Sequence, residues 1–249
     1  MKLLILAIYS KNKEYDEMLS IQRSYVHKFP NITSYFIDFR EHQTNDIEVE
    51  GDFIYVKGKD TFINITYKTI KALEYAVQHL KFDYMIRTNM STIINIPALN
   101  AYCSTLRKTK IYTGGLLTPL HWIDKKSGIK DQTYWGAKYF QGTSIIMSRD
   151  VVSFMIKNKS NIHYDIIDDV AIGIFIEHYF PYALYTDLPY FYTAPKNIKP
   201  SEVDNQFVFF RNRAYKNRVG DVKNMKIIRN VLYKTTRRTK KFKAGSSNP

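Results

Sequence analysis

The stretch ITYKTIKALEYAVQHLKFDYMIR, residues 65–87, decides the fold. In residues 65–80 apolar side chains recur at helical spacing on one face, which predicts an amphipathic helix. Residues 83–87 follow as a short β-branched and aromatic run that is typical of a strand. A helix that leads directly into a strand is half of a β-α-β unit, so we expect an α/β sheet with parallel strands.

The same alternation extends in both directions from this stretch. A helix is predicted at residues 15–27, and another begins at Ser148, since serine is a favourable N-cap. The predicted strands are residues 3–9, 34–39, 53–56, 83–87, 110–113, 143–147 and 206–210. With 249 residues the chain suits one domain. We therefore predict an α/β fold, with a mixed, mostly parallel sheet flanked by helices, in a single domain of residues 1–235.

The positive charge is concentrated at the C-terminal end. Residues 211–243 hold thirteen Lys and Arg against one acid, which is +12 of the total charge of +14. A nucleic-acid-binding fold usually distributes its basic residues over a face, so nucleic acid is not the expected partner. Residues 221–233 have helical periodicity, whereas residues 236–249 are expected to be a disordered basic tail. The tail is either a solvated end or a peripheral contact to an anionic membrane.

The expected compartment is the cytoplasm. Cys103 is the one cysteine, so no disulfide within the chain is possible. The apolar run of residues 3–9 is too short for a signal peptide and fits a buried first strand. No segment reaches the ~20 apolar residues that span a bilayer. A soluble or peripherally membrane-bound protein is expected.

Several common enzyme classes lack their motifs in this chain. It has no glycine-rich phosphate loop of the Walker or dinucleotide type and no Cys/His cluster with zinc spacing. Residues 114–141 form a long connection that contains both tryptophans, and connections of this kind often bind ligands.

Four segments, taken in their order, resemble the β-1,3-galactosyltransferase and Fringe group of glycosyltransferases. The first is similar to that group's Asp-x-Tyr-x-Asn-Leu-Thr-x-Lys-Thr stretch, and the second lies where the group has a strand running into an Asp-Asp-Asp metal motif. The third is similar to its glycine-led strand before a helix, and the fourth to its acidic-Asp-Val-x-x-Gly signature. The segments are DTFINITYKT at 60–69, FDYMIRTNMS at 82–91, QGTSIIMSRD at 141–150 and IDDVAIG at 167–173.

The resemblance implies a GT-A-like, Rossmann-like fold and an inverting transfer of a sugar from a nucleotide-sugar donor, a UDP-sugar by analogy, to a hydroxyl of a glycan acceptor. Inverting transfer needs a base for the acceptor's proton and a positive group for the departing diphosphate. By resemblance the base is Asp169, and Asp168 contacts the acceptor. Two acids that merely cap a buried helix are the alternative.

The chain departs from the group at the metal motif. Asn89, Met90 and Ser91 replace the three aspartates, and hard divalent cations favour carboxylate ligands. We therefore expect a divalent cation such as Mn²⁺ to be either weakly bound or absent, and no other cofactor. Arg211 and Arg213, just after the predicted strand 206–210, are expected to neutralise the diphosphate instead, because a guanidinium matches phosphate oxygens. An ordinary basic surface is the alternative.

The remaining site predictions are less specific. Open α/β sheets bind nucleotides at the carboxyl ends of their strands, so Tyr9 and Ser10 after the first strand are donor candidates. Arg87, Asn89 and Ser91 join them, while Trp135 and Gly142 are acceptor candidates. Trp122, Trp135 and His121 of the long connection either form a sugar platform or lid or simply pack in the fold. Lys68 is either part of the matching motif or a solvated helix residue.

Other functions remain open from the sequence. A retaining transferase or a nucleotidyltransferase would use a similar sheet. A non-catalytic basic protein that binds nucleic acid or polysaccharide is the alternative outside enzymes, since the group's metal carboxylates are missing.

Overall fold

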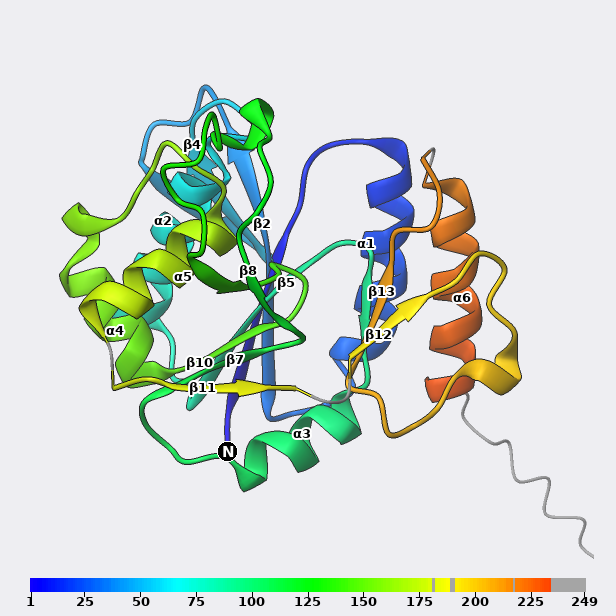
Figure 1. The fold of residues 1–249 in the computed structure, drawn as a ribbon. Helices are drawn as coiled ribbons and strands as arrows, with labels where there is room; N and C mark the ends of the chain where they lie inside the picture. Colours follow the sequence, from blue (N-terminus) through cyan, green and yellow to red (C-terminus); the bar gives the residue numbers. More distant parts are fainter. Residues whose placement is uncertain (181, 189–190, 217, 234–249) are drawn as a thin grey trace, which may run out of the picture.

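The computed structural model describes residues 1–180, 182–188, 191–216 and 218–233. Its main sheet has eight strands in the order β11-β7-β10-β5-β1-β2-β4-β3 (Figure 1). These strands are β1 (Leu3–Ile8), β2 (Ile32–Arg40), β3 (Ile47–Glu50), β4 (Phe53–Lys57), β5 (Tyr84–Asn89), β7 (Ile111–Gly114), β10 (Ile145–Ser148) and β11 (Leu184–Asp187). β1 pairs in parallel with β2 and β5, whereas β10 runs antiparallel between β5 and β7. The predicted mixed, mostly parallel α/β sheet is confirmed.

The central strand β1 is buried on both faces. Leu3, Ile5 and Ala7 belong to one apolar core, and Leu4 and Leu6 belong to the other. Successive side chains of a strand point to opposite faces, so a strand between two cores needs an unbroken apolar run. The run at the N-terminus is therefore the strand that separates the two helical layers.

Helices cover both faces of the sheet (Figure 1). One core includes residues of α2, α4 and α5, and the other includes residues of α1, α3 and α6. The helices are α1 (Lys13–Val26), α2 (Ile65–His79), α3 (Ile96–Thr105), α4 (Arg149–Lys157), α5 (Asp168–Tyr179) and α6 (Val219–Tyr233). None of the described helices is long and apolar enough to cross a membrane.

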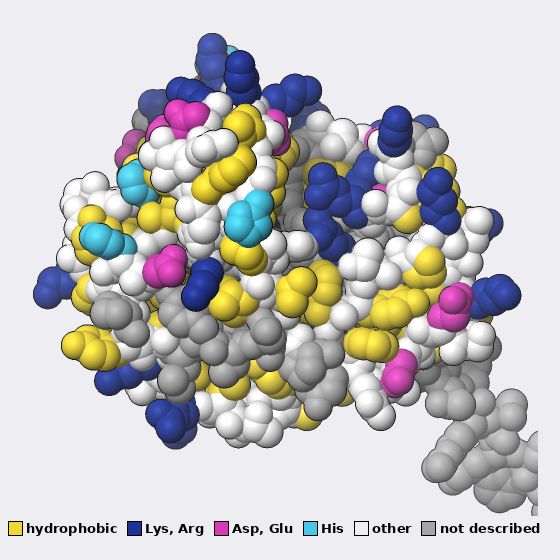
Figure 2. Space-filling view, viewed as in Figure 1, with side chains coloured by type: hydrophobic (Ala, Val, Ile, Leu, Met, Phe, Trp, Pro, Cys, Tyr) yellow, Lys and Arg dark blue, Asp and Glu magenta, His cyan; other side chains and the backbone are white. Residues whose placement is uncertain are grey.

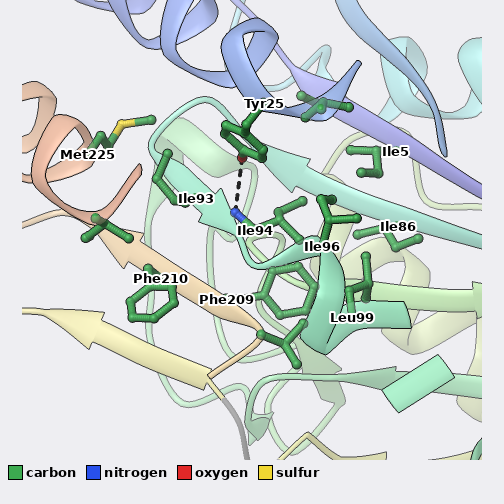
Figure 3. Packing of buried hydrophobic residues seen from close by; sticks show 14 of the residues in the cluster. Ile5, Tyr25, Ile86, Ile93, Ile94, Ile96, Leu99, Phe209, Phe210 and Met225 are labelled. Carbon is green, nitrogen blue, oxygen red and sulfur yellow. Dashed lines mark hydrogen bonds between the residues drawn. The ribbon is translucent and has the colours of Figure 1, made fainter. Parts of the chain in front are cut away.

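A second, three-stranded sheet lies against α6. It has the order β12-β13-β6, with β6 (Thr92–Ile94), β12 (Phe191–Ala194) and β13 (Phe209–Asn212). Phe209 and Phe210 of β13 pack into the core with Met225 of α6 (Figure 3). The hydroxyl of buried Tyr25 accepts a hydrogen bond from the Ile94 N–H at 3.1 Å, which ties α1 to this sheet (Figure 3).

The structure corrects several predicted boundaries. β5 continues past Arg87 to Asn89, and β13 begins later than predicted, so that Arg211 lies inside the strand. The long connection 114–141 contains a two-stranded sheet of β8 (Leu117–Pro119) and β9 (Lys138–Phe140). The predicted tail, residues 236–249, lies outside the described residues.

Candidate active site

Asp168 and Asp169 form the first turn of α5, and their side chains have different partners. Acids are favoured there because the helix dipole places partial positive charge at the N-terminus. Asp168 is completely buried. Its carboxylate accepts hydrogen bonds from the Thr69 hydroxyl at 2.6 Å and from Arg87 Nε and Nη2 at 2.9 and 2.7 Å.

This buried ion pair joins α5 to α2 and to β5. Arg87 is itself only 5% exposed, and its third contact is a donated bond to the Gly142 carbonyl oxygen. The structure thus engages both side chains inside the protein, while the acceptor contact of Asp168 and the donor contact of Arg87 stay predictions. A buried charge needs such a partner, because an unpaired one is costly to desolvate.

Asp169 is the less buried residue of the two. It is partly buried and accepts hydrogen bonds from the backbone N–H groups of Gly142 and Val170, each at 2.9 Å. Burial raises the pKa of Asp169, the neighbouring Asp168 carboxylate raises it further, and Arg87 opposes both. A carboxylate with a raised pKa is a better proton acceptor than an ordinary exposed one.

Gly142 lies where a side chain has no room. A Cβ atom at this position would overlap the guanidinium of Arg87. The glycine lets its carbonyl oxygen meet Arg87 while its N–H meets Asp169. Gly142 was predicted to contact the acceptor, and its place beside Asp169 is compatible with that role.

Arg211 senses the charges of Asp169 and of two further arginines, Arg213 and Arg218. Arg211 is partly buried and donates a hydrogen bond to the side-chain oxygen of Gln141. Burial lowers the pKa of Arg211, the nearby charges of Arg213 and Arg218 lower it further, and Asp169 opposes them. Figure 2 shows Lys and Arg side chains gathered beside a hollow near the middle of this face, over the place where β13 ends in Figure 1. An anion placed here would relieve the repulsion among the arginines.

The turn 89–91 is joined to Arg211 through the second sheet. In the antiparallel pair of β6 and β13, Arg211 lies opposite Thr92, one residue after Ser91. The backbone N–H of Asn212 donates to the Ser91 carbonyl oxygen at 2.9 Å. The sheet therefore places Arg211 beside the turn 89–91.

The side chains of this turn do not fit a divalent cation. The Asn89 amide oxygen already accepts from the Thr92 hydroxyl at 2.9 Å and the Ser91 hydroxyl at 3.3 Å. Met90 and Ser91 are buried, and neither supplies a carboxylate. Within residues 1–180, 182–188, 191–216 and 218–233, no group of three or more His, Cys, Asp or Glu is placed to hold a metal ion.

The donor candidates at the end of β1 lie at the same sheet edge. Ile8 is in register with Asn89 of β5, so Tyr9 and Ser10 follow at the carboxyl ends of parallel strands. Tyr9 is only 5% exposed, and its hydroxyl donates to Asp16. Its ring packs edge-on against Phe53 at 5.3 Å between centroids, which leaves Ser10 as the more accessible of the two candidates.

Two residues of the first motif support this edge, of which sequence reasoning left the role of Lys68 open and missed Thr69. Lys68 is fully buried and not solvated; its ammonium group donates to the Tyr9 carbonyl oxygen at 2.7 Å and to Asp60 at 3.2 Å. Thr69 binds Asp168, as described above. Asp60, Lys68 and Thr69 all occur in the first motif, so the motif itself was the signal.

A family model for galactosyltransferases matches residues 37–180, which is more than half of the chain. The chain belongs to the galactosyltransferase family. The matched region includes Asp168, Asp169 and the turn 89–91, whereas Arg211 and Arg213 lie beyond it. The resemblance seen in the sequence is thus supported at family level.

Two individual proteins are similar to this member of the galactosyltransferase family. The hydroxyproline O-galactosyltransferase GALT6 of Arabidopsis thaliana is 20% identical over 197 residues, which cover 71% of this chain and 28% of the relative. The chain therefore spans only a minor part of that relative's length. A solved structure, a glycosyltransferase involved in the glycosylation of the major capsid of PBCV-1, matches 91% of this chain and 100% of its own with 12% identity and a TM-score of 0.45.

Proposed function

We propose that the protein is an inverting glycosyltransferase that moves a sugar from a UDP-sugar to a hydroxyl of a glycan acceptor. Membership of the galactosyltransferase family supports sugar transfer, and galactose is the first donor sugar to test. The observation that supports the mechanism most is the pairing of β6 with β13, which brings Arg211 to the turn 89–91. By resemblance, this turn lies where the β-1,3-galactosyltransferase and Fringe group has its Asp-Asp-Asp motif. In this proposal the fixed positive charge of Arg211 does the work of a metal ion.

The donor is proposed to lie at the carboxyl ends of β1 and β5. Parallel strands of open α/β sheets leave a crevice at this edge, where nucleotides bind. Ser10 and Asn89 lie there, and Arg211 follows on the adjoining small sheet. The diphosphate then faces the arginines, and the sugar faces Asp169.

In the reaction, the acceptor oxygen attacks the anomeric carbon of the donor sugar. The acceptor proton passes to the Asp169 carboxylate, while the bond from the anomeric carbon to the phosphate oxygen breaks and its electron pair leaves with UDP. Arg211 and Arg213 neutralise the charge that develops on the diphosphate. Because attack and departure occur on opposite faces of the sugar, the anomeric configuration inverts.

Metal independence is tested by assaying the purified protein with UDP-galactose and other nucleotide sugars, with and without EDTA. Turnover is expected to survive chelation, because arginines take the place of the cation. Arg211→Ala is expected to lower kcat roughly 10- to 100-fold, the value of a charge-assisted hydrogen bond. Lys216→Ala is the control, since Lys216 is an exposed base of the loop that follows β13.

Loss of turnover in EDTA, with full recovery on addition of Mn²⁺, would contradict the proposed role of the arginines. Equal activity of the Arg211→Ala and Lys216→Ala variants would contradict it as well.

A further inference from the structure

The connection 114–141 exposes an unusual amount of apolar surface beside the site. Leu116, Trp122, Ile123 and Trp135 are 61%, 36%, 50% and 43% exposed. Exposed apolar side chains that gather in one loop next to a catalytic site indicate a binding surface. The two indoles differ, however, in how they are connected to the site.

Trp122 is fixed to the wall of the site by a hydrogen bond. Its Nε1–H donates to the Tyr139 hydroxyl at 3.2 Å, while more than a third of the residue stays accessible. A tryptophan held through its N–H is a rigid apolar surface that needs little ordering when a ligand binds.

Tyr139 connects Trp122 to the proposed catalytic groups. It lies in β9, which packs on α5 so closely that a Cβ atom on Gly173 would overlap it. The chain continues from β9 directly into Gln141 and Gly142, which contact Arg211 and Asp169 respectively. Burial raises the pKa of Tyr139, Asp169 raises it further, and Arg211 lowers it, in agreement with a hydroxyl near both charges.

We infer that Trp122 is the platform on which the acceptor binds, and that the acceptor presents a pyranose ring to it. The inference rests on the proposed function. A pyranose has an apolar C–H face, which suits the indole, and a rim of hydroxyl groups, which suits Tyr139 and Asp169. A ligand pocket of this kind combines an aromatic surface with a few polar groups that fix orientation. Of the two tryptophans predicted to form a sugar platform, the inference assigns the acceptor to Trp122.

The chain contains two tryptophans, so each can be observed alone. Under excitation selective for tryptophan, the emission of Trp135→Phe comes from Trp122 and that of Trp122→Phe from Trp135. The probes are the methyl glycosides of galactose, glucose, N-acetylglucosamine, mannose and xylose, together with a hydroxyproline peptide. We expect the glycoside that binds most tightly to change the tryptophan emission of the Trp135→Phe variant and to leave the emission of the Trp122→Phe variant unchanged.

Kinetics provide the second readout. Trp122→Ala is expected to raise the KM for the glycoside roughly tenfold, a larger change than that of the KM for the donor. Trp135→Ala is the matched variant, an equally exposed indole of the same connection, and its acceptor KM is expected to stay within about twofold of the wild type. A thermal melt of each variant checks folding.

Calorimetric titration of the wild type with UDP separates the two proposals. If UDP binds and UDP-sugar is hydrolysed, the proposed function stands and three outcomes would overturn the inference. They are an unchanged acceptor KM in Trp122→Ala, a change in fluorescence confined to Trp135, and sugar transfer to the peptide but to none of the glycosides. If UDP does not bind, the proposed function itself fails and this inference with it.

Discussion

Replacement of Asp169 by asparagine is expected to lower kcat by about 10²- to 10⁴-fold, the usual contribution of a general base. The Gly142 and Val170 N–H groups bind different oxygens of the carboxylate, so the amide, which has the same size, keeps an acceptor for one of them and the fold should persist. Affinity for UDP should be nearly unchanged, because Asp169 acts on the acceptor. Steady-state kinetics and UDP titration measure the two effects.

Asp165→Asn is the control for this substitution. Asp165 is an exposed carboxylate shortly before α5, so its loss should leave kcat unaltered. An Asp169→Asn variant with wild-type kcat would contradict the assignment of the base.

The pH profile tests the same assignment. Burial and the Asp168 carboxylate raise the pKa of Asp169 above its usual value of about 4. A base works only when deprotonated, so kcat/KM should fall as the pH falls through this raised pKa. The acid limb of the profile is therefore expected above about pH 4, and it should disappear from the residual activity of Asp169→Asn. An acid limb common to both proteins would assign it to another group.

Substitution of Asp168 by alanine is expected to lower the free energy of unfolding by about 3 to 5 kcal/mol. The change leaves the guanidinium of Arg87 buried without its carboxylate and removes the acceptor of the Thr69 hydroxyl. Urea denaturation monitored by circular dichroism measures the loss. Activity should fall too, because α5, which carries Asp169, loses its tie to β5.

Two variants show whether the ion pair is the cause. Glu17→Ala removes an exposed partner of Lys226 at 2.9 Å and should change stability by less than about 1 kcal/mol. In the double variant Arg87→Met/Asp168→Leu no charge remains buried, so much of the lost stability should return. A double variant less stable than Asp168→Ala would contradict an effect of unpaired charge.

The sequence predicted elements whose signal is local. β1 is an apolar run buried on both sides, and α2 has a clear helical period, so both were found close to their observed bounds. The difference between Asp168 and Asp169 is also partly local, since adjacent residues of a helix point in different directions. Which of the two faces inward depends on α2 and β5, which are distant in sequence.

The placement of Arg211 depends on contacts that no local pattern encodes. β13 pairs with β6 across more than a hundred residues, and this pairing carries Arg211 to the turn 89–91. The sequence identified the arginine by its chemistry but placed it after the strand instead of within it. The burial of Lys68 could not be predicted for a related reason. A lysine on a helix is buried only when acceptors distant in sequence, such as the Tyr9 carbonyl oxygen, bind its ammonium group.

A crystal structure of the protein with UDP, grown in the presence of EDTA, tests the central claim most directly. We expect the diphosphate to lie within hydrogen-bond distance of the Arg211 or Arg213 guanidinium. The Asp169 carboxylate is expected to be open to the space beyond the terminal phosphate. A diphosphate bound away from both arginines, or an Asp169 carboxylate sealed from that space, would contradict it.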